Sequence, residues 1–333
     1  MGDGVENAQR SNGSTRPAPN VSPDELSDRA LFEGSSRASR ALWHDVAEFA
    51  WTPYPVLLSG ETGTGKSMLA REIHRRSRRA AGPFVALPLP GIPEELRHVE
   101  LCGCARGAFT GATHDRPGAL ELASGGTLFL DELGHASAKL QQSLLTVLES
   151  ERVQRLGESR PRRVSVRYVF ATSSDLLAQV QRGAFLSELY FRVQGFRICL
   201  PPLRDRREDI LPLAERFVVN ALRELEKPPR FLISPSLAEY MRMAPWPGNI
   251  RELKSVCQYL AVRARPDVTL DCSHLPAPGE SGCTCGEGPA ARALEVLARF
   301  DGNKAKTARE LCLSRGALYR LLARAGEPES GHP

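Results

Sequence analysis

The octapeptide Gly60-Glu61-Thr62-Gly63-Thr64-Gly65-Lys66-Ser67 lies between an apolar run, Pro55–Ser59, and a helical pattern that begins at Met68. This is the G-x-x-x-x-G-K-[ST] pattern in the strand-loop-helix context of a phosphate-binding loop. Glycines allow backbone N–H groups to curl around phosphate oxygens, and the following helix N-terminus adds partial positive charge. We expect Lys66 to neutralise the β- and γ-phosphates and the Ser67 hydroxyl to ligate Mg²⁺. The flanking elements disfavour the alternative, a glycine-rich turn with an incidental lysine.

A second apolar run ends in two acidic residues, as the other half of a nucleotide site requires. It reads Gly126-Thr127-Leu128-Phe129-Leu130-Asp131-Glu132. A buried strand would carry Asp131 to the carboxyl edge of a sheet, beside the phosphate loop, to hold the Mg²⁺ shell. Glu132 would then polarise the attacking water. A strand that enters a solvated turn is the alternative, but the two motifs together favour a nucleoside triphosphatase.

Short apolar runs alternate with amphipathic helical stretches over residues 31–203, where we expect the core domain. We predict strands at Val56–Ser59, Phe84–Leu87, Thr127–Leu130 and Val166–Ala171, with helical patterns such as Met68–Arg79 and Leu140–Glu149 between them. This order predicts an α/β fold, a parallel sheet covered by helices on both faces. After Pro201-Pro202 the apolar runs become wholly helical, so we expect a small helical lid over 204–264. Its helices are predicted at Ile210–Glu226, Ser236–Met243 and Ile250–Val262.

The composition is that of an ordinary globular protein, with 41% hydrophobic and 25% charged residues among 333. No run of about eighteen apolar residues is present, and the first twenty residues lack the apolar core of a signal peptide. We therefore expect a cytoplasmic protein with no membrane partner. Residues 1–30 are rich in Gly, Ser, Asn and Pro, which predicts a disordered tail.

Between the two nucleotide motifs stands the hexapeptide Gly107-Ala108-Phe109-Thr110-Gly111-Ala112. This GAFTGA sequence resembles the signature loop of the NtrC-type AAA+ activators of sigma-54 transcription. The resemblance runs from about Leu31 to the C-terminus. It includes GPF at Gly82–Phe84, GGTLFLDE at Gly125–Glu132, LPPLRDRREDI at Leu200–Ile210 and WPGNIREL at Trp246–Leu253. With the phosphate loop, six ordered motifs identify the chain as a member of that family, with a P-loop AAA+ core.

The resemblance implies a function and further site residues. It implies ATP as the nucleotide, hydrolysis coupled to open-complex formation by sigma-54 RNA polymerase, and assembly into a ring, which we expect to be a hexamer. Phe109 and Thr110 would contact sigma-54, since a loop that exposes a Phe is costly unless a partner covers it. Arg192 resembles the arginine finger that reaches a neighbour's γ-phosphate, and Arg251 resembles the lid sensor that contacts nucleotide. The alternatives are a Phe109 tucked into its own domain and surface salt bridges for the two arginines.

Three positions depart from the family pattern. Pro88 stands where the family usually has an Asn that switches the catalytic Glu, and Ser173 stands where the sensor strand usually has Asn. Leu186 stands where a second finger arginine is often found. Proline has no amide donor, and serine has a shorter reach than asparagine. The departures leave nucleotide binding intact but motivate a rival hypothesis, a DNA-binding regulator whose AAA+ core is a hydrolysis-impaired scaffold.

The C-terminal end of the chain is basic and helical. Between Ala290 and Arg324 stand eight basic and three acidic residues, so this segment alone carries the net charge of the whole chain, +5. A compact basic end on a neutral body favours a polyanion partner. Apolar faces broken at Gly302-Asn303 and Cys312–Ser314 predict three short helices over 290–326, after a linker at 265–289. This all-α unit resembles the Fis-type helix-turn-helix of the same family.

Five side chains of this unit are expected near the phosphates or bases of double-stranded DNA at upstream activator sites. They are Lys304, Lys306, Arg315, Tyr319 and Arg320. The alternative is a basic helical hairpin for protein contact. Cys312 stands where the family commonly has Gly, so the turn is altered slightly.

Eight cysteines are scattered along the chain, and ordinary free thiols are the favoured interpretation. Four residues of the linker region could supply soft ligands to zinc, namely Cys272, His274, Cys283 and Cys285. Cys102 and Cys104 could form a redox pair. The C-x-C spacing, however, is not the usual C-x₂-C of zinc sites.

Many members of the family carry a receiver or ligand-sensing domain before the AAA+ core. About thirty residues are too few to fold into one. We therefore expect the activating signal to arrive through a partner protein or through control of expression.

Overall fold

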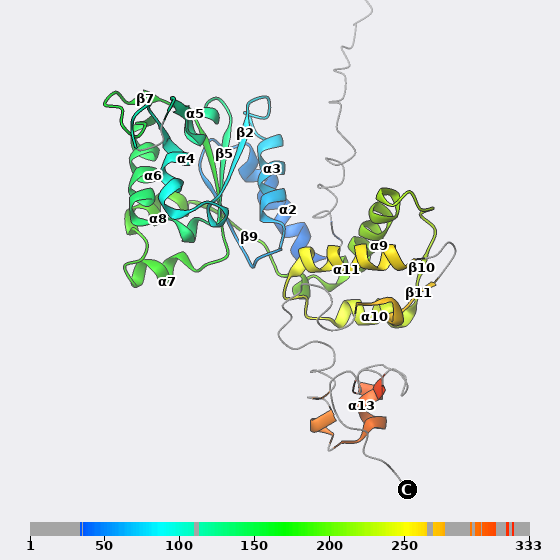
Figure 1. Cartoon of the computed structure of the whole chain (residues 1–333). Coiled ribbons are helices and arrows are strands. Elements are labelled where there is room, and N and C mark those ends of the chain that lie inside the picture. Colours follow the sequence, from blue (N-terminus) through cyan, green and yellow to red (C-terminus); the bar gives the residue numbers. More distant parts are fainter. Residues whose placement is uncertain are drawn as a thin grey trace, which may run out of the picture.

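The computed structural model describes Gly34 and residues 36–109, 113–264, 269–276, 297–300 and 302–310, together with Leu294, Leu318, Tyr319 and Leu322. Its centre is a parallel sheet of five strands in the order β2-β5-β8-β1-β9 (Figure 1). The strands are β1 (Val56–Ser59), β2 (Phe84–Pro88), β5 (Thr127–Asp131), β8 (Arg167–Thr172) and β9 (Phe196–Cys199). The predicted α/β class is therefore confirmed.

Side chains of the central strands alternate between two apolar cores, one on each face of the sheet. In β8, Val169 and Ala171 enter one core, whereas Tyr168 and Phe170 enter the other. Every residue of β8 is buried, as expected for a parallel strand covered on both faces.

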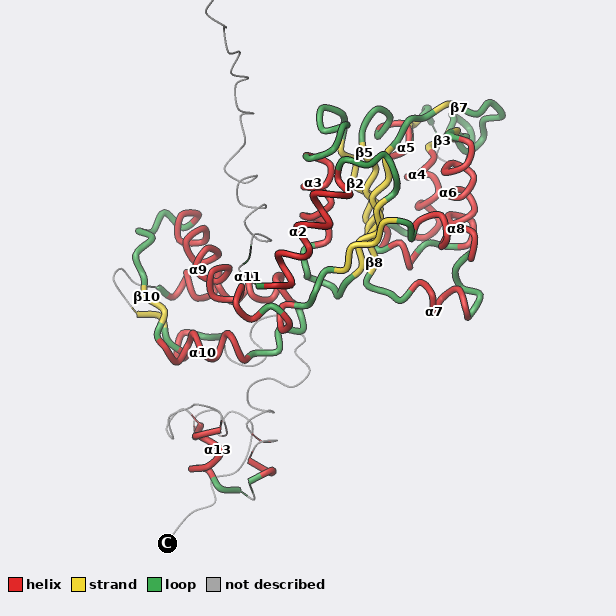
Figure 2. Tube along the Cα trace, turned by 180° about the vertical axis from the view of Figure 1, so that it is seen from behind, coloured by secondary structure: helices red, strands yellow, loops and turns green. Residues whose placement is uncertain are grey.

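Helices cover both faces of the sheet (Figures 1 and 2). One core contains residues of α2 (Arg37–Ala50) and α3 (Lys66–Arg75). The other contains residues of α4 (Glu94–Cys102), α5 (Ala119–Leu122), α6 (Ala138–Ser150), α7 (Leu176–Gln181) and α8 (Ser187–Val193). Short two-stranded hairpins project from this second layer, β3 (Gly103–Cys104) with β4 (Arg116–Pro117), and β6 (Arg152–Val153) with β7 (Arg162–Arg163).

The start of α2 is fixed by a residue far along the chain. The Ser36 hydroxyl accepts a hydrogen bond from Ser39 N as the N-cap of the helix. The same hydroxyl donates to the buried carboxylate of Asp209 at 2.7 Å, and the Ser39 hydroxyl donates to it at 2.6 Å. Asp209 belongs to the next unit, so these bonds tie α2 to the lid.

The lid consists of α9 (Arg207–Glu224), α10 (Pro235–Met243) and α11 (Asn249–Arg263). Ser234 caps α10 through its hydroxyl, with Pro235 at the first helical position. The prediction that the chain is wholly helical after Pro202 was wrong in one detail. Strands β10 (Leu232–Ile233) and β11 (Thr269–Leu270) pair in parallel beside the helices.

Two further elements differ from the predictions. Strand β9 was not predicted, because it is four residues long and two of them, Arg197 and Cys199, are exposed, which leaves Phe196 and Ile198 as its apolar signal. Helix α3 ends at Arg75 rather than Arg79, because its apolar periodicity stops at the buried Ile73 and arginines follow.

The C-terminal residues that the structure describes form a small helical cluster. Helix α13 (Lys304–Glu310) follows Gly302, which adopts a φ of +78°, and the Asn303 side chain accepts a hydrogen bond from Lys306 N at the helix start. An apolar core joins Leu297, Ala308, Leu318 and Leu322. In the described part of the chain, no helix combines the length and apolarity needed to cross a membrane.

Candidate active site

The phosphate loop connects β1 to α3. Gly65 has a φ of +101° immediately before the helix, a conformation that glycine adopts without steric cost. Lys66 begins the helix and is buried, and its ammonium group donates to the carbonyl oxygens of Gly60 at 2.8 Å and Glu61 at 3.2 Å. The loop therefore presents its helix N-terminus and one cation to the same space.

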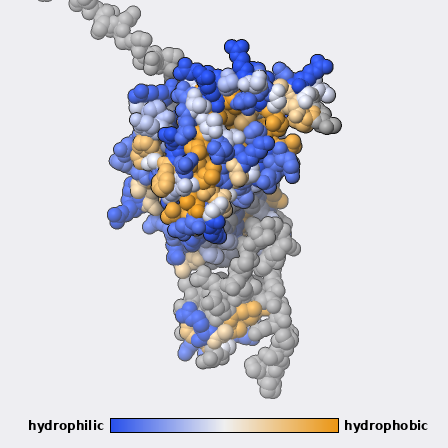
Figure 3. All heavy atoms as spheres, turned by 90° about the vertical axis from the view of Figure 1, so that its left-hand side faces the viewer, coloured by the Kyte–Doolittle hydropathy of each residue, from blue (hydrophilic) through white to orange (hydrophobic). Residues whose placement is uncertain are grey.

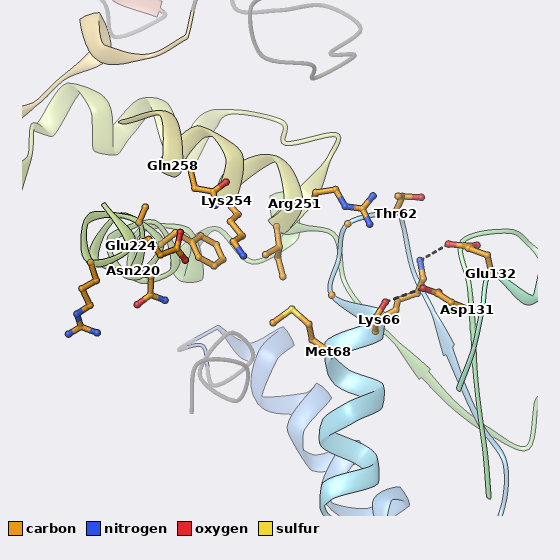
Figure 4. A pocket seen from close by; sticks show the side chains of 17 residues that line it. Thr62, Lys66, Met68, Asp131, Glu132, Asn220, Glu224, Arg251, Lys254 and Gln258 are labelled. Carbon is orange, nitrogen blue, oxygen red and sulfur yellow. Dashed lines mark hydrogen bonds and ion pairs between the residues drawn. The ribbon is translucent and has the colours of Figure 1, made fainter. Parts of the chain in front are cut away.

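The two predicted halves of the site meet at the carboxyl edge of the sheet. The Ser67 hydroxyl donates to Asp131 Oδ2 at 3.1 Å, and Lys66 Nζ lies 3.3 Å from Glu132 Oε1 (Figure 4). Strands β1 and β5 flank β8, so parallel pairing brings their ends together. A hydroxyl and a carboxylate oxygen at this separation are the donors that Mg²⁺ prefers, so the residues present fit that ion.

Glu132 is an ionised carboxylate in this environment. Burial alone would raise the pKa of Glu132, but hydrogen bonds from Ser173 and the charge of Lys66 hold this pKa below its ordinary value. Ser173 donates both its backbone N–H and its hydroxyl to Glu132 Oε2, each at 2.8 Å. A negatively charged carboxylate is the form that can accept a proton.

A cavity of about 660 Å³ opens between this edge and the lid (Figure 4). Of the residues predicted to bind nucleotide, it is lined by Thr62, Gly63, Gly65, Lys66, Ser67, Asp131, Glu132 and Arg251. Arg251 extends from α11 toward Thr62. Sequence reasoning missed Met68, Phe217, Asn220, Ala221, Arg223, Glu224, Ile250, Lys254 and Gln258. Apart from Met68, these residues belong to the lid helices α9 and α11. They line the cavity only because the lid packs on the core, which the sequence does not show.

The remaining loop residues serve the loop itself or the lid. Thr64 is buried, and its hydroxyl donates to the Glu61 carbonyl at 2.8 Å. The Glu61 side chain turns away and accepts hydrogen bonds from both terminal nitrogens of Arg204. These bonds, together with one from Asn249, lower the pKa of Glu61.

Asn249 joins the phosphate loop to the lid. It is fully buried and has a φ of +53°, in the left-handed region that few residues besides glycine adopt. Its amide donates to the Thr62 carbonyl at 3.0 Å and to Glu61 Oε2 at 3.2 Å, and its side-chain oxygen accepts from Leu203 N at 2.8 Å. Asparagine tolerates this conformation. The Gly248-Asn249 pair was therefore the one sequence signal for a left-handed turn at this point.

Substitution of Asn249 should destabilise the protein in two separable steps. Asn249→Gly keeps the backbone conformation but loses the side-chain bonds, which should lower the free energy of unfolding by about 2 kcal/mol. Asn249→Ala should cost about 1 kcal/mol more, because alanine resists the left-handed conformation. Denaturant titration measures both differences. Equal stability of either variant and the wild type would contradict this role.

Arg192 lies on α8, apart from the cavity of its own chain. It is about half exposed and pairs with Glu149 of α6 at 3.1 Å, and it is not among the described residues that line the cavity. The adjacent Phe191 is 68% exposed. Figure 3 shows this side of the molecule, where hydrophobic surface lies among hydrophilic residues. Leu186, at the position of the absent second arginine, stands at the N-cap position of α8 without a side-chain capping bond and packs against the core.

The GAFTGA segment begins on the hairpin formed by β3 and β4. Phe109 is 42% exposed and is therefore not tucked into the core, whereas Thr110, Gly111 and Ala112 lie outside the described residues. Sequence reasoning missed the support of this hairpin by the loop between β6 and β7. Leu156 exchanges backbone hydrogen bonds with Gly103 and Ala105.

An ion pair strengthens the same support. Arg155, almost buried, pairs with Glu121 at 2.6 Å and lies 3.7 Å from Asp115 on the return side of the hairpin. The backbone bonds of Leu156 and the ion pairs of Arg155 therefore connect the β6–β7 loop to the β3–β4 hairpin.

The C-terminal cluster contains three of the predicted DNA contacts. Lys304 Nζ lies 4.9 Å from the centre of the Tyr319 ring, and Tyr319 and Lys306 are exposed. Arg315, Arg320 and Cys312 lie outside the described residues.

The cysteines that the structure describes are free thiols. Cys102 and Cys104 are both buried, and burial raises the pKa of Cys102 to about 12. His274 of the suggested zinc set pairs with Asp271 at 2.9 Å, while Cys283 and Cys285 lie outside the described residues. Among the residues that are described, no group of three or more metal-ligating side chains is found.

Comparison with known families assigns each unit of the chain. Residues 32–199 match the sigma-54 interaction domain, residues 204–282 match the AAA+ ATPase lid domain, and residues 294–324 match the bacterial regulatory protein, Fis family.

Individual relatives agree with this assignment. The chain is 39% identical over 327 residues to the nitric oxide reductase transcription regulator NorR2 of Cupriavidus necator, covering 88% of this chain and 62% of that protein. It is 37% identical over 305 residues to the regulatory protein AtoC of Escherichia coli, covering 86% of this chain and 66% of that protein. The chain thus spans less than two thirds of the length of these relatives.

Solved structures of NtrX from Brucella abortus in complex with ADP and with ATP match with a TM-score of 0.69 and 30% sequence identity, covering 91% of this chain and 72% of those chains. The family predicted from GAFTGA and the nucleotide motifs is thus confirmed. The chain belongs to the family of sigma-54-dependent transcriptional activators, with an AAA+ ATPase domain, its lid and a Fis-type helix-turn-helix.

Proposed function

We propose that this chain binds ATP between sheet and lid, hydrolyses it, and uses the cycle to remodel sigma-54 RNA polymerase toward the open complex. The observation that carries the proposal is the convergence of Lys66, Ser67, Asp131 and Glu132 at one cavity. A cation, two oxygen donors and an ionised carboxylate are the groups that phosphoryl transfer to water requires.

The chemistry follows from the position of each group. Lys66 would leave Glu132 and the loop carbonyls to bind β- and γ-phosphate oxygens. Glu132 would accept a proton from water, whose oxygen bonds to the γ-phosphorus as the bond to the β–γ bridging oxygen breaks, giving ADP and phosphate. Ser67 and Asp131 would hold Mg²⁺, which neutralises phosphate charge when bound.

The remaining partners follow from the exposed residues. Phe109 and Thr110 would contact sigma-54, because they belong to the GAFTGA sequence of this family and Phe109 is exposed, hence accessible to a partner. Arg192 would complete the site of a neighbouring subunit in a ring, probed by the mixing experiment below. Lys304, Lys306, Arg315, Tyr319 and Arg320 would contact double-stranded DNA, with the second helix of the pair in the major groove.

The rival function is a DNA-binding regulator with a hydrolysis-impaired scaffold, and Pro88 at the end of β2 is the observation in its favour. Steady-state ATPase assays on concentrated protein separate the two functions. Turnover well above that of a phosphate-loop variant supports the proposal.

Thr110→Ala should separate coupling from catalysis. Because Thr110 lies in the GAFTGA sequence and in neither nucleotide motif, ATPase activity should stay within about twofold while open-complex formation with sigma-54 polymerase is lost. Permanganate footprinting of promoter DNA measures the second activity. Thr113→Ala, beyond the hexapeptide, is the matched control. Equal loss of both activities in Thr110→Ala would show that the loop is structural.

A further inference from the structure

The edge of the sheet opposite the nucleotide site carries loops from several parts of the chain. Because the five strands are parallel, the amino ends of β1, β2 and β9 lie at that edge together. The β3–β4 hairpin, on which the GAFTGA segment begins, leaves from the end of α4 and leads through α5 to the start of β5, so it belongs to the same edge. Figure 1 shows α5 and β7 at this edge, away from the lid.

Positive charge is concentrated at this edge, where α3 ends and the chain turns toward β2. Four of five consecutive residues are arginines, namely Arg75, Arg76, Arg78 and Arg79. The first two share one carboxylate, that of the buried Glu72, and the last donates to Ser165. Arg78 is exposed and has no hydrogen-bond or ion-pair partner among the described residues. Four cations and one anion leave a local charge of +3, against +5 for the whole chain.

Exposed aromatic rings lie beside these arginines. The guanidinium carbon of Arg78 lies 5.0 Å from the centre of the Trp51 ring, and this indole is 58% exposed. Tyr54, 57% exposed, stacks on Phe196 at 5.4 Å. A guanidinium that stacks on an aromatic face keeps its fork of N–H donors available for a carboxylate or a phosphate. Trp51 therefore positions Arg78 with its donors directed to a partner outside the chain.

We infer that these residues form a second DNA-binding surface, on the AAA+ core and separate from the helix-turn-helix, which holds the phosphate backbone of a duplex. This amino-edge patch consists of Trp51, Tyr54, Arg75, Arg76, Arg78 and Arg79. Clustered guanidinium groups neutralise successive phosphates and release their counterions, and a tyrosine hydroxyl donates to phosphate oxygens. A peptide partner needs a groove or pockets for its side chains, whereas a duplex needs only surface cations along its backbone.

The position of the patch gives it a use beyond the proposed function. It shares its edge with the GAFTGA hairpin, so the DNA that it holds lies beside the protein that the hairpin contacts. The inference does not depend on ATP hydrolysis.

Arg78→Ala should weaken binding of the full chain to a fluorescein-labelled duplex of random sequence by about tenfold at 0.1 M salt. Loss of one phosphate contact should also reduce the slope of log affinity against log salt by about 1. Fluorescence anisotropy measures both quantities. Arg182→Ala, which removes an exposed arginine at the end of α7, is the control matched in charge and should bind as the wild type does.

Trp51→Ala tests the positioning of Arg78, because it keeps every charge of the patch. Binding should weaken by about threefold with an unchanged salt slope, and Trp51→Phe, which keeps a ring, should recover the wild-type affinity. Thermal melts establish that the variants are folded.

Photocrosslinking separates the patch from the helix-turn-helix. The photoreactive residue p-benzoylphenylalanine in place of Tyr54 should crosslink to the duplex, whereas the same residue in place of the exposed Leu177 of α7 should not. Absence of the crosslink from position 54 would overturn the inference, as would an Arg78→Ala variant with wild-type affinity and salt slope.

Two other occupants are tested with the same variant. The ATPase activity of Arg78→Ala should depend on protein concentration as that of the wild type does, and a shift to higher concentration would assign the patch to a contact between subunits. Loss of poly-glutamate binding at unchanged DNA binding would assign it to an acidic protein segment. Either result would overturn the inference and leave the proposed ATPase function standing.

Discussion

Lys66→Ala should reduce ATP turnover to background, a loss of at least about a thousandfold. Lys66 is the cation at the helix N-terminus of the phosphate loop, and its buried ammonium is held there by the carbonyls of Gly60 and Glu61. Its removal leaves the phosphates without that charge and Glu132 without its ion pair. Phosphate release from concentrated protein measures the rate, and a thermal melt establishes that the variant is folded.

Glu132→Gln is the matched comparison, because it alters the proton acceptor and keeps the cation. This variant should retain bound ATP in a filter-binding assay while failing to hydrolyse it, whereas Lys66→Ala should show weakened binding. If wild-type turnover does not exceed that of Lys66→Ala, the scaffold hypothesis holds and the proposed ATPase function is wrong.

Arg192→Ala should cost at least about a hundredfold in turnover and leave nucleotide affinity nearly unchanged. The arginine lies outside its own cavity, and Leu186 offers no second cation nearby. A lone subunit would therefore have an incomplete site, so the specific activity of the wild type should rise with protein concentration.

Glu149→Gln is the control for Arg192→Ala, since it breaks the same ion pair but keeps the arginine. An exposed ion pair is worth about 0–1 kcal/mol, so this variant should stay within a few-fold of the wild type. If it is as impaired as Arg192→Ala, the arginine has a structural role only.

Mixing Arg192→Ala with Lys66→Ala tests action in trans. Each variant is inactive alone, but a mixed ring can place an intact phosphate loop beside an intact arginine of the next subunit. Partial recovery of turnover is expected at intermediate ratios. No recovery at any ratio would exclude an arginine shared between subunits.

Much of the fold could be predicted because its signals are local. An apolar run followed by the phosphate loop or by two acidic residues predicts a buried strand that carries the motif at its carboxyl end. Parallel pairing of such strands with β8 then brings Lys66 near Glu132. Strand β9 escaped prediction because it is four residues long and its exposed Arg197 and Cys199 leave Phe196 and Ile198 as its apolar signal.

The rest of the site depends on contacts between distant residues. The sequence marks Ser173 only as a shorter side chain than asparagine, whereas its two bonds to Glu132 span 41 positions. Asn249 meets Glu61 across 188 positions, and no spacing rule connects them. The first contact follows from the pairing of β5 with β8, and the second follows from the packing of the lid on the core. Local sequence pattern encodes neither.

The carboxylate of Asp209 that fixes the start of α2 has a consequence for protein synthesis. Ser36 leaves the ribosome 173 residues before this partner. At about 5–20 residues per second, α2 waits roughly 9–35 s for its anchor. During that interval the apolar residues of α2 have no lid above them, so chaperone contact with the nascent chain is most needed between the emergence of α2 and that of α9.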